Sequence, residues 1–321
     1  MIDSTSAVPL PLALCLMGPT ASGKTGLAIK LRQQLPVELI SVDASQVYRE
    51  LNIGTAKPSL EEQKLAPHRL IDIREPAETY SAAEFCRDAL EEMRQITAAG
   101  RIPLLVGGTM FYFRALEFGL SELPEADANI RAELETEARS LGWPAMHERL
   151  ATIDPAIAQR IDRHDAQRIQ RALEIYRLTG MAPSEAQAQT RQAPPPYRFI
   201  KAALMPGNRE RLRQDIARRF VMMLEQGLVE EVDVLLKRGD INPSLASMRM
   251  VGYRQVVDYL HGKVDKNTMI DQAVTATRRL AKRQFTWLRS YPDVVRFDPQ
   301  KPGFEQSVGE HFADKLGMIC P

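Results

Sequence analysis

The sequence predicts an α/β fold in which helices flank a parallel sheet and an all-helical segment is inserted into the chain. Two observations support this prediction. Short apolar runs alternate with amphipathic segments over residues 12–109, which is typical of a parallel sheet covered on both faces. Strand signals then vanish over 119–196 and return afterwards. We therefore expect a core formed by residues 1–118 and 197–321, interrupted by a helical insertion domain over 119–196.

The predicted elements of the first third alternate regularly. The strand-like runs cover residues 12–18, 37–45 and 101–109, and the helical segments cover 27–35 and 80–100. In the second of these helices, Ser81 and Glu84 have the spacing of a capping box, and Gly100 is placed to end the helix. This alternation brings the carboxyl ends of the three strands to one edge of the sheet, where ligands bind in open α/β sheets.

Helical spacing dominates the rest of the chain. Helical stretches in the insertion cover 127–141, 145–151 and 165–179, before a polar, proline-rich connection at 183–196. After it come a strand at 197–205, a long helix near 209–237, a helix near 252–260, a basic helix near 268–289 and a last strand at 294–298. The return of strand character makes the insertion an interruption of one α/β core.

Composition excludes several classes of protein. The 321 residues are 44% hydrophobic and 26% charged, an ordinary globular balance that rules out a disordered chain, a collagen-like fibre and a disulfide scaffold. The 42 Lys and Arg nearly match the 41 Asp and Glu, which gives a net charge of +1. This balance argues against a protein that coats nucleic acid by bulk electrostatics, but it leaves room for a local basic groove.

The cysteines and the first apolar run indicate in which cellular compartment the protein is expected. Cys15, Cys86 and Cys320 are odd in number and have no metal-binding or redox spacing, so we expect reduced thiols in a cytoplasmic protein. The apolar run at 8–17 is too short to span a bilayer and lacks a preceding cationic segment. We therefore expect no membrane partner.

The strongest single motif is a phosphate loop. Residues 18–25, GPTASGKT, match G-x-x-x-x-G-K-[ST] at every fixed position, between an apolar run and an amphipathic segment. In such a loop, backbone N–H groups and a helix N-terminus surround phosphate oxygens, a Lys reaches the outer phosphate and a hydroxyl ligates Mg²⁺. The predicted phosphate-binding residues are Gly18, Pro19, Thr20, Ala21, Ser22, Gly23, Lys24 and Thr25, with Thr25 as the Mg²⁺ ligand. The motif predicts a P-loop NTPase-like core that binds a diphosphate or triphosphate, and it does not specify ATP.

An acidic residue follows the second predicted strand rather than the third. A P-loop ATPase usually has a strand that ends in a metal-supporting Asp, whereas the third strand here ends in Gly107, Gly108 and Thr109. Asp43, after the second strand, should face the phosphate loop because parallel strands end at the same edge. It could ligate a metal, act as a base on an acceptor, or be a turn or N-cap aspartate.

Several strings together resemble the bacterial tRNA dimethylallyltransferase family, the MiaA-type isopentenyltransferases. They lie, in the order of the family, at 18–25, 41–49, 52–58, 67–73, 81–85, 103–112, 167–176, 251–255 and 277–289. The phosphate loop alone is unspecific, whereas its combination with GTAKP, GGTxxY and KRQxTW is highly specific. The resemblance covers nearly the whole chain.

The resemblance implies a complete reaction. A dimethylallyl group would pass from dimethylallyl diphosphate to N6 of the adenosine at position 37, 3′-adjacent to the anticodon, in tRNAs reading codons that begin with U. The phosphate loop would then hold the leaving diphosphate, assisted by Mg²⁺. The resemblance also implies that Asp43 takes the proton of the amine, that Arg219 contacts the diphosphate and that Thr109 lies beside the target base. Arg219 could also be a solvated residue of an amphipathic helix, and Thr109 an ordinary N-cap.

The anticodon stem-loop is the expected partner of a protein that we predict to be a monomer. On the basic helix, Arg278, Lys282 and Arg289 share one face, and Ala276, Leu280 and Trp287 lie on the opposite face, which should dock on the core. Arginines beside Tyr253 suit phosphate contact and base stacking. The predicted tRNA-binding residues are Asp43, Ala44, Ser45, Gln46, Thr109, Arg131, Gln167, Arg168, Ile169, Gln170, Arg171, Arg249, Met250, Val251, Gly252, Tyr253, Arg254, Arg278, Lys282, Arg283 and Arg289.

Two other classes share a phosphate loop. A small-molecule or nucleotide kinase usually has a lid rich in phosphate-binding Arg, but residues 131–177 contain eight Arg and eight Asp or Glu. An RNA-binding NTPase switch would need the carboxylate that the third strand lacks. Phe111 and Tyr112 could stack on a base, but their apolar run favours the core.

Overall fold

The computed structural model describes residues 10–190 and 193–317, and the chain forms two units. One unit comprises Met1–Glu117 and Pro195–Pro321, and the other comprises Phe118–Pro194. The larger unit contains the sheet and the helices around it, and the smaller unit is entirely helical within the described residues. None of the described helices combines the length and apolar composition needed to cross a bilayer.

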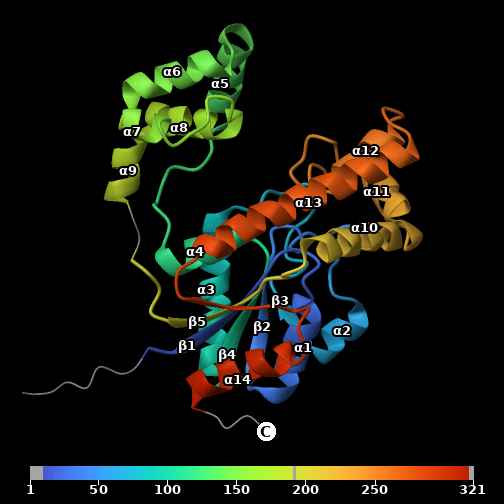
Figure 1. Ribbon diagram of the computed structural model, residues 1–321. Coiled ribbons are helices and arrows are strands. Elements are labelled where there is room, and N and C mark those ends of the chain that lie inside the picture. The colour runs from blue at the N-terminus through green and yellow to red at the C-terminus, as the bar shows by residue number, and fades with distance from the viewer. Residues whose placement is uncertain (1–9, 191–192, 318–321) are drawn as a thin grey trace, which may run out of the picture. The chain divides into compact units, whose positions relative to one another are not determined.

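A six-stranded parallel sheet forms the centre of the larger unit and confirms the predicted fold class (Figure 1). Its strands are β1 (Leu12–Met17), β2 (Val37–Val42), β3 (His68–Arg69), β4 (Ile102–Gly107), β5 (Arg198–Leu204) and β6 (Val294–Phe297). Their order is β3-β2-β4-β1-β5-β6. Met17 of β1 and Val42 of β2 both pair with Gly107 of β4, so the turn after β4 lies between the phosphate loop and Asp43.

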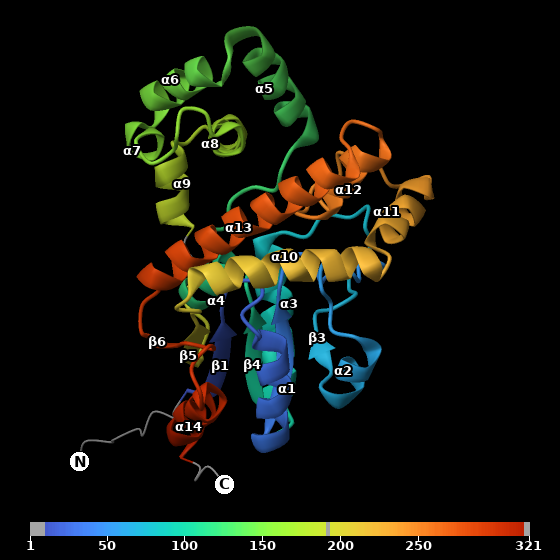
Figure 2. The same cartoon turned by 45° about the vertical axis from the view of Figure 1, so that its right-hand side comes forward.

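Helices cover both faces of this sheet because side chains alternate along its buried strands. Leu14 and Leu16 of β1 share a core cluster with residues of α1 (Lys24–Gln34) and α14 (Phe304–Leu316). Helix α3 (Ala82–Ala98) packs against β4 and β2 on the other face (Figure 2). The predicted capping box of α3 is confirmed, since Ser81 Oγ accepts from the Glu84 amide at 3.1 Å and Glu84 Oε2 accepts from the Ser81 amide at 2.8 Å.

The helices α10 (Arg209–Glu225), α11 (Leu228–Lys237), α12 (Tyr253–Leu260) and α13 (Lys266–Ser290) follow β5. Helices α10 and α13 contact each other beyond the carboxyl ends of the strands (Figure 2). The prediction of one helix over 209–237 is wrong, because the backbone at Gly227 has a φ of 97° and separates α10 from α11. The sequence pattern did not reveal this break because the apolar spacing continues through it.

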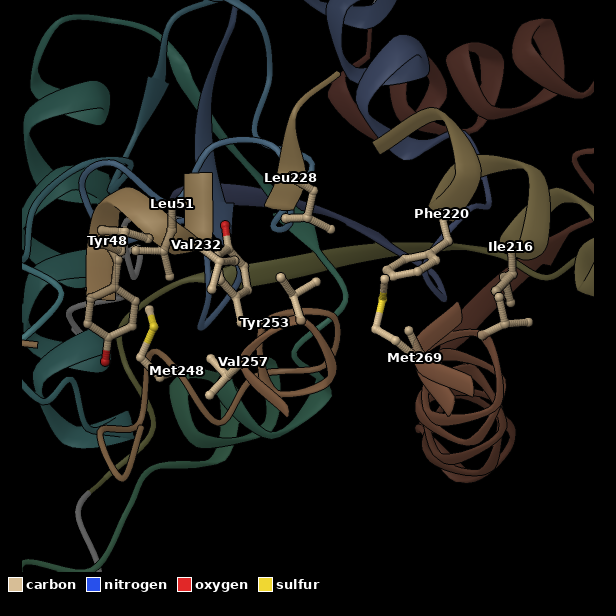
Figure 3. Packing of buried hydrophobic residues seen from close by; sticks show 14 of the residues in the cluster. Tyr48, Leu51, Ile216, Phe220, Leu228, Val232, Met248, Tyr253, Val257 and Met269 are labelled. Carbon is tan, nitrogen blue, oxygen red and sulfur yellow. The ribbon is translucent and has the colours of Figure 1, made fainter. Parts of the chain in front are cut away.

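A second hydrophobic cluster holds these helices to the loops after β2. It includes Leu212, Ile216 and Phe220, which form the buried stripe of α10. Figure 3 shows Ile216 and Phe220 with Met269 of α13. Figure 3 also shows Tyr253 in this cluster beside Val232 and Val257. The cluster therefore fixes α10, α12 and α13 over the edge of the sheet at which the strands end.

The smaller unit has a core of its own. Its helices are α5 (Ala128–Leu141), α6 (Trp143–Ile153), α7 (Pro155–Ala158), α8 (Ala166–Thr179) and α9 (Pro183–Gln189). Leu134, Met146 and Ile169 are fully buried at its centre. The stretch 183–196, predicted as a proline-rich connection, contains α9. This helix begins at Pro183, and the first turn is the part of a helix that tolerates proline. Asp154 caps α7 and also accepts a hydrogen bond from the Ser184 amide at 2.7 Å.

Several elements, most of them short, were not predicted from the sequence. They are α2 (Leu60–Leu65), β3, α4 (Met110–Phe118), α7, α9 and α14. Cys15 is buried and Cys86 partly buried, and both are free thiols. Burial raises the pKa of Cys86 to about 12. Cys320 lies outside the described residues.

Candidate active site

A cavity of about 630 Å³ opens within the larger unit, at the carboxyl ends of β1, β2 and β4. The phosphate loop, Asp43 and Thr109 form its polar side. The opposite side is largely apolar, and it is lined by Ile216, Phe220, Met223, Met250, Leu280 and Trp287. A cavity with one highly polar side and one apolar side suits a small molecule that carries both a charged group and a hydrocarbon group.

The phosphate loop leads directly into α1. Gly23 adopts the left-handed conformation, with a φ of 82°, immediately before the helix begins at Lys24. A Cβ atom at Gly18 would lie 2.7 Å from Ser22 Oγ and 3.0 Å from the Leu204 carbonyl oxygen, so a larger residue would crowd the loop there. Ser22 Oγ is buried and has no partner in the described part of the chain. This hydroxyl and the N-terminus of α1 suit an anion.

Two cations and one carboxylate share the cavity. Lys24 Nζ donates a hydrogen bond of 2.7 Å to the Pro19 carbonyl oxygen within the loop. Burial lowers the pKa of Lys24 to about 7, opposed by the charge of Asp43 and assisted by that of Arg219. Burial also lowers the pKa of Arg219, again opposed by Asp43. The site thus holds two partly buried cations beside one carboxylate, and a bound anion would stabilise them.

Asp43 occupies a defined turn after β2. Its Oδ1 accepts hydrogen bonds from the Ser45 amide at 2.9 Å and the Ser45 hydroxyl at 2.5 Å. Among the residues that the structure describes, no donor bonds Oδ2. Asp43 is therefore a turn aspartate whose second oxygen remains available to a ligand in the cavity.

The turn after β4 supports the Asp43 turn. Thr109 Oγ1 accepts a hydrogen bond of 3.1 Å from the Ala44 amide. A Cβ atom at Gly107 would lie 2.0 Å from the Val42 carbonyl oxygen, so the position two residues before Thr109 has room only for glycine. Glycine at this position therefore permits the close approach of the β2 and β4 backbones. Thr109 itself holds the backbone beside Asp43 as well as lining the cavity.

Gln46 and the loop at 52–56 complete this side of the cavity. Ser41 Oγ donates to Gln46 Oε1 at 3.0 Å, and Gln46 Nε2 donates to the Ala56 carbonyl oxygen at 3.3 Å. Ala44, Ser45 and Gln46 all line the cavity. The sequence motifs at 41–49 and 52–58 therefore meet in space through the Gln46 side chain.

Helix α13 presents different faces to the cavity and to solvent. Leu280, Arg283 and Trp287 line the cavity. The prediction that Leu280 and Trp287 dock on the core is therefore wrong, because Ala281, Phe285 and Leu288 form the core face instead. The predicted cationic face is exposed, and it consists of Arg278, Lys282 and Arg289. Across the described ranges, none of these three cations has a carboxylate partner within 4.0 Å.

One side chain of α13 was missed by sequence reasoning. Gln284 is 9% exposed, and its Oε1 accepts a hydrogen bond of 2.9 Å from the Thr20 amide of the phosphate loop. Its Nε2 donates to the Gly108 carbonyl oxygen at 2.8 Å. The available signal was a polar residue next to Phe285, on the apolar stripe of a helix.

The segment at 249–254 divides into exposed and buried residues. Arg249 and Arg254 are exposed, and Met250 and Val251 line the cavity. The prediction that Tyr253 offers its ring to a base is wrong. That ring is fully buried and packs against Gly54, where a Cβ would lie 2.4 Å from Tyr253 Cε2.

The Tyr253 hydroxyl explains why the residue is polar despite its burial. It donates a hydrogen bond of 2.6 Å to Glu231, whose carboxylate also accepts from the Ile53 amide at 2.8 Å. Burial and the nearby Glu231 charge raise the pKa of Tyr253. Tyr253 therefore supports the 52–54 loop from inside the molecule.

In the smaller unit, Glu174 brings two predicted tRNA-binding arginines together. Its buried carboxylate accepts from Arg131 Nε at 2.9 Å and from Arg171 at 2.6 Å. Gln170 bonds the Arg131 carbonyl oxygen at 3.2 Å. Ile169 is fully buried in the core, so its place in the predicted tRNA-contacting set is wrong. The exposed members of the set are Gln167 and Arg168.

Two neighbouring aromatic residues of α4, Phe111 and Tyr112, have different surroundings. Phe111 is 50% exposed and lines the cavity, which contradicts the expectation that it belongs to the core. Tyr112 is buried, as expected, and stacks on Phe85 with ring centroids 4.4 Å apart. Phe111 is thus the aromatic residue of this helix that a ligand could contact.

The chain matches a known family over most of its length. The family described as IPP transferase matches residues 46–291. The tRNA dimethylallyltransferase of Thioalkalivibrio sulfidiphilus (strain HL-EbGR7) is 58% identical over 284 residues, which cover 88% of this chain and 89% of that protein. The structure resembles the full-length tRNA isopentenylpyrophosphate transferase of Bacillus halodurans, with 37% identity, a TM-score of 0.70 and coverage of 95% and 97% of the two chains. It also resembles the Staphylococcus epidermidis tRNA delta(2)-isopentenylpyrophosphate transferase, with 30% identity and a TM-score of 0.68. That match covers 96% of this chain and 99% of the other chain.

Proposed function

The chain belongs to the IPP transferase family and is a tRNA dimethylallyltransferase that prenylates A37, and from this premise we propose how its own residues perform the transfer. The donor is dimethylallyl diphosphate, and the acceptor is N6 of the adenosine at position 37. The preferred tRNAs read codons that begin with U. The observation that supports this assignment most directly is the placing of Lys24, Arg219 and Asp43 in one cavity with an apolar wall.

The phosphate loop holds the diphosphate of the donor. Lys24 and Arg219 supply charge that neutralises the leaving group, and the amides of residues 21–25 donate hydrogen bonds to its oxygens. Positive charge that is poorly solvated in the free enzyme gains most from a bound anion. These groups therefore stabilise the charge that develops on diphosphate as the carbon–oxygen bond breaks.

Mg²⁺ accompanies the diphosphate in this proposal. Within residues 10–190 and 193–317, no three Cys, His, Asp or Glu side chains are grouped to hold a metal ion. Mg²⁺ at substrate phosphates needs few protein ligands, since waters and phosphate oxygens complete its shell. The half-buried Thr25 hydroxyl at the start of α1 fits that role. When bound, Mg²⁺ supplies additional positive charge to the leaving group.

The apolar wall holds the dimethylallyl group beside the acceptor. Phe220, Met223 and Leu280 exclude water from this part of the cavity, which keeps the allylic carbon from hydrolysis. The adenine amine enters opposite, near Thr109 and Asp43. The new bond joins N6 to the primary allylic carbon, while the carbon–oxygen bond breaks and its electron pair leaves with diphosphate.

Asp43 accepts the proton that N6 loses. An exocyclic adenine amine is a poor nucleophile because its lone pair is delocalised into the ring. Asp43 Oδ2 has no hydrogen-bond donor in the described part of the chain, and Oδ1 is held by Ser45. A fixed carboxylate with one free oxygen is suited to general-base catalysis.

The anticodon stem-loop contacts exposed cations that have no carboxylate partner among the described residues. Arg278, Lys282 and Arg289 of α13 and the exposed Arg249 and Arg254 serve the phosphates. The insertion, residues 119–196, also contacts the tRNA through Arg131, Gln167, Arg168, Gln170 and Arg171. The base leaves the stack of the loop to enter the cavity, at a cost of about a few kcal/mol that these contacts offset. The enzyme acts as a monomer.

Replacing Asp43 tests the assignment of the base. The Asp43→Asn variant keeps the size of the side chain and its turn, but the amide cannot take a proton at neutral pH. We expect turnover to fall by a factor of about 10²–10⁴ while tRNA affinity changes little. Single-turnover transfer from labelled dimethylallyl diphosphate and direct tRNA binding measure the two quantities.

The Asp72→Asn variant is the matched control. Asp72 pairs with Lys57 at 2.5 Å and does not line the cavity, so transfer should persist there. An Asp43→Asn enzyme that turns over like the wild type would remove Asp43 from the mechanism. Hydrolysis of ATP without transfer to tRNA would overturn the proposed reaction itself.

A further inference from the structure

The Gln284 side chain joins two parts of the active site that are far apart in the sequence. Its Oε1 accepts from the Thr20 amide, 264 residues away, and its Nε2 donates to the Gly108 carbonyl oxygen, 176 residues away. Both bonds are short, at 2.9 and 2.8 Å. One primary amide therefore satisfies an N–H of the phosphate loop and a C=O of the turn after β4.

The fit around this amide is close. A Cβ atom placed on Gly108 would lie 2.5 Å from Gln284 Nε2, so the amide rests directly on the glycine backbone. Only 9% of the residue is exposed. Buried polar groups of this kind cost free energy when they lose their partners, so the bridge is held firmly in place.

The turn reached by Gln284 also carries the support of Asp43. Thr109 follows Gly108, and its hydroxyl accepts from the Ala44 amide beside Asp43 at 3.1 Å. The phosphate loop is thereby linked through Gln284 and Gly108 to Thr109 and the Asp43 turn. In the proposed reaction, these two ends hold the leaving diphosphate and the accepting base.

We propose that Gln284 is a positioning residue, which sets the distance between the diphosphate held by the phosphate loop and the Asp43 carboxylate. This proposal rests on the proposed function of the two ends. Gln284 acts through Thr20 and Gly108 and does not itself contact the reacting atoms. Misplacement of reacting groups by about 1 Å can cost on the order of a hundredfold in rate. The bridge should therefore affect turnover more than it affects tRNA binding.

Two substitutions separate positioning from general stability. Gln284→Met keeps the length of the side chain and loses both hydrogen bonds, so we expect a turnover that is lower by roughly ten- to a hundredfold at every pH. Gln284→Glu keeps both hydrogen bonds only when its carboxyl is protonated, with the carbonyl accepting from Thr20 and the hydroxyl donating to Gly108. Burial against a carbonyl oxygen favours that protonated form.

The pH profile is the decisive measurement. The turnover of Gln284→Glu, divided by that of the wild type at the same pH, should rise as the pH falls, whereas the same ratio for Gln284→Met should stay low and flat. The control Thr286→Ala removes an exposed hydroxyl whose one bond within the described residues is to the Lys282 carbonyl oxygen of its own helix, and it should leave turnover unchanged. The affinity for tRNA should be the same in all four proteins.

Several outcomes would overturn the proposal. They are wild-type turnover in Gln284→Met, a pH-independent ratio for Gln284→Glu, or a loss that appears only as weaker tRNA binding. If Gln284→Met does not fold, the ratio for Gln284→Glu still decides. A wild-type enzyme that transfers no dimethylallyl group would instead contradict the proposed function, so the two failures are distinguishable.

Discussion

At the scale of single residues, the charges of the cavity have unequal surroundings. Lys24 is partly buried, and among the described residues the one hydrogen bond of its ammonium goes to a carbonyl oxygen of its own loop. Asp43 keeps one carboxylate oxygen bonded and the other free. The Lys24 ammonium can therefore bind an anionic ligand, and the free oxygen of the Asp43 carboxylate can accept a proton.

The titration of Lys24 provides a test of the diphosphate site. Burial lowers the pKa of Lys24 to about 7, and a bound diphosphate should raise it again by its negative charge. Between these two values the complex holds one proton more than the free enzyme, so diphosphate affinity should weaken as the pH rises above about 7. Calorimetry of inorganic diphosphate binding, in buffers that differ in ionisation enthalpy, measures the proton uptake.

A variant with permanent charge supplies the control for this measurement. Lys24→Arg stays protonated throughout, so its uptake should reflect only the protonation of diphosphate itself. We expect the wild type to take up more protons than Lys24→Arg in the slightly alkaline range. Equal uptake by both proteins would show that Lys24 is already charged in the free enzyme.

At the scale of elements, the helices differ in how their arginines are used. Arg131 of α5 and Arg171 of α8 converge on Glu174, which is completely buried. Burial raises the pKa of Glu174, but hydrogen bonds from Arg131, Arg171 and the Asp127 amide outweigh it, and the net pKa is lowered. These arginines therefore hold the insertion helices together, whatever else they contact.

Replacing Glu174 should destabilise the smaller unit. Glu174→Gln keeps the shape of the side chain but leaves two arginines without a charged partner, and we expect a loss of about 1–3 kcal/mol in the free energy of unfolding. Because the pKa of Glu174 is lowered on folding, its contribution is present above the unfolded pKa and disappears as the pH falls through the folded value.

Urea unfolding of the full chain measures this effect near neutral pH. The control Glu133→Gln changes a side chain that is 66% exposed and pairs with Arg177 at 3.2 Å. Exposed pairs contribute little, so this control should change stability by less than about 1 kcal/mol. Equal losses in the two variants would contradict a special role for the buried carboxylate.

At the scale of the whole molecule, a net charge of +1 averages over regions of different character. Residues 131–177 are balanced, with eight Arg and eight Asp or Glu, whereas 278–289 contains five cations and no acid. Overall neutrality therefore limits how the enzyme holds tRNA. We expect a few placed contacts to one folded RNA, and not the extended electrostatic contact of a strongly basic protein.

The salt dependence of tRNA binding tests this expectation. The slope of log affinity against log salt should correspond to a handful of phosphate contacts. Arg278→Ala and Lys282→Ala should each reduce the slope by about 1. The control Lys30→Ala removes an exposed cation of α1 that pairs with Glu305 at 2.6 Å, and it should leave the slope unchanged. A slope typical of a strongly basic coat protein, or the same loss in the control, would contradict this distribution.

Much of the fold was predictable because its signals are local. The buried strands are continuous apolar runs, and Ser81 with Glu84 specifies the start of α3 within four residues. Elements that depend on packing were missed. The two-residue strand β3 is too short to show a period, and the break at Gly227 interrupts a pattern that otherwise continues from α10 into α11.

The sequence by itself determined the phosphate loop, the alternation of the longer strands and helices around it, and the motifs that identify the family. Only the tertiary structure decided that Tyr253 is buried against Gly54 and that Gln284 joins Thr20 to Gly108. It also decided which arginines have carboxylate partners. The physical reason is the range of the interactions: a motif depends on neighbouring residues, whereas a buried hydrogen bond between residues 264 positions apart exists only once the chain has packed.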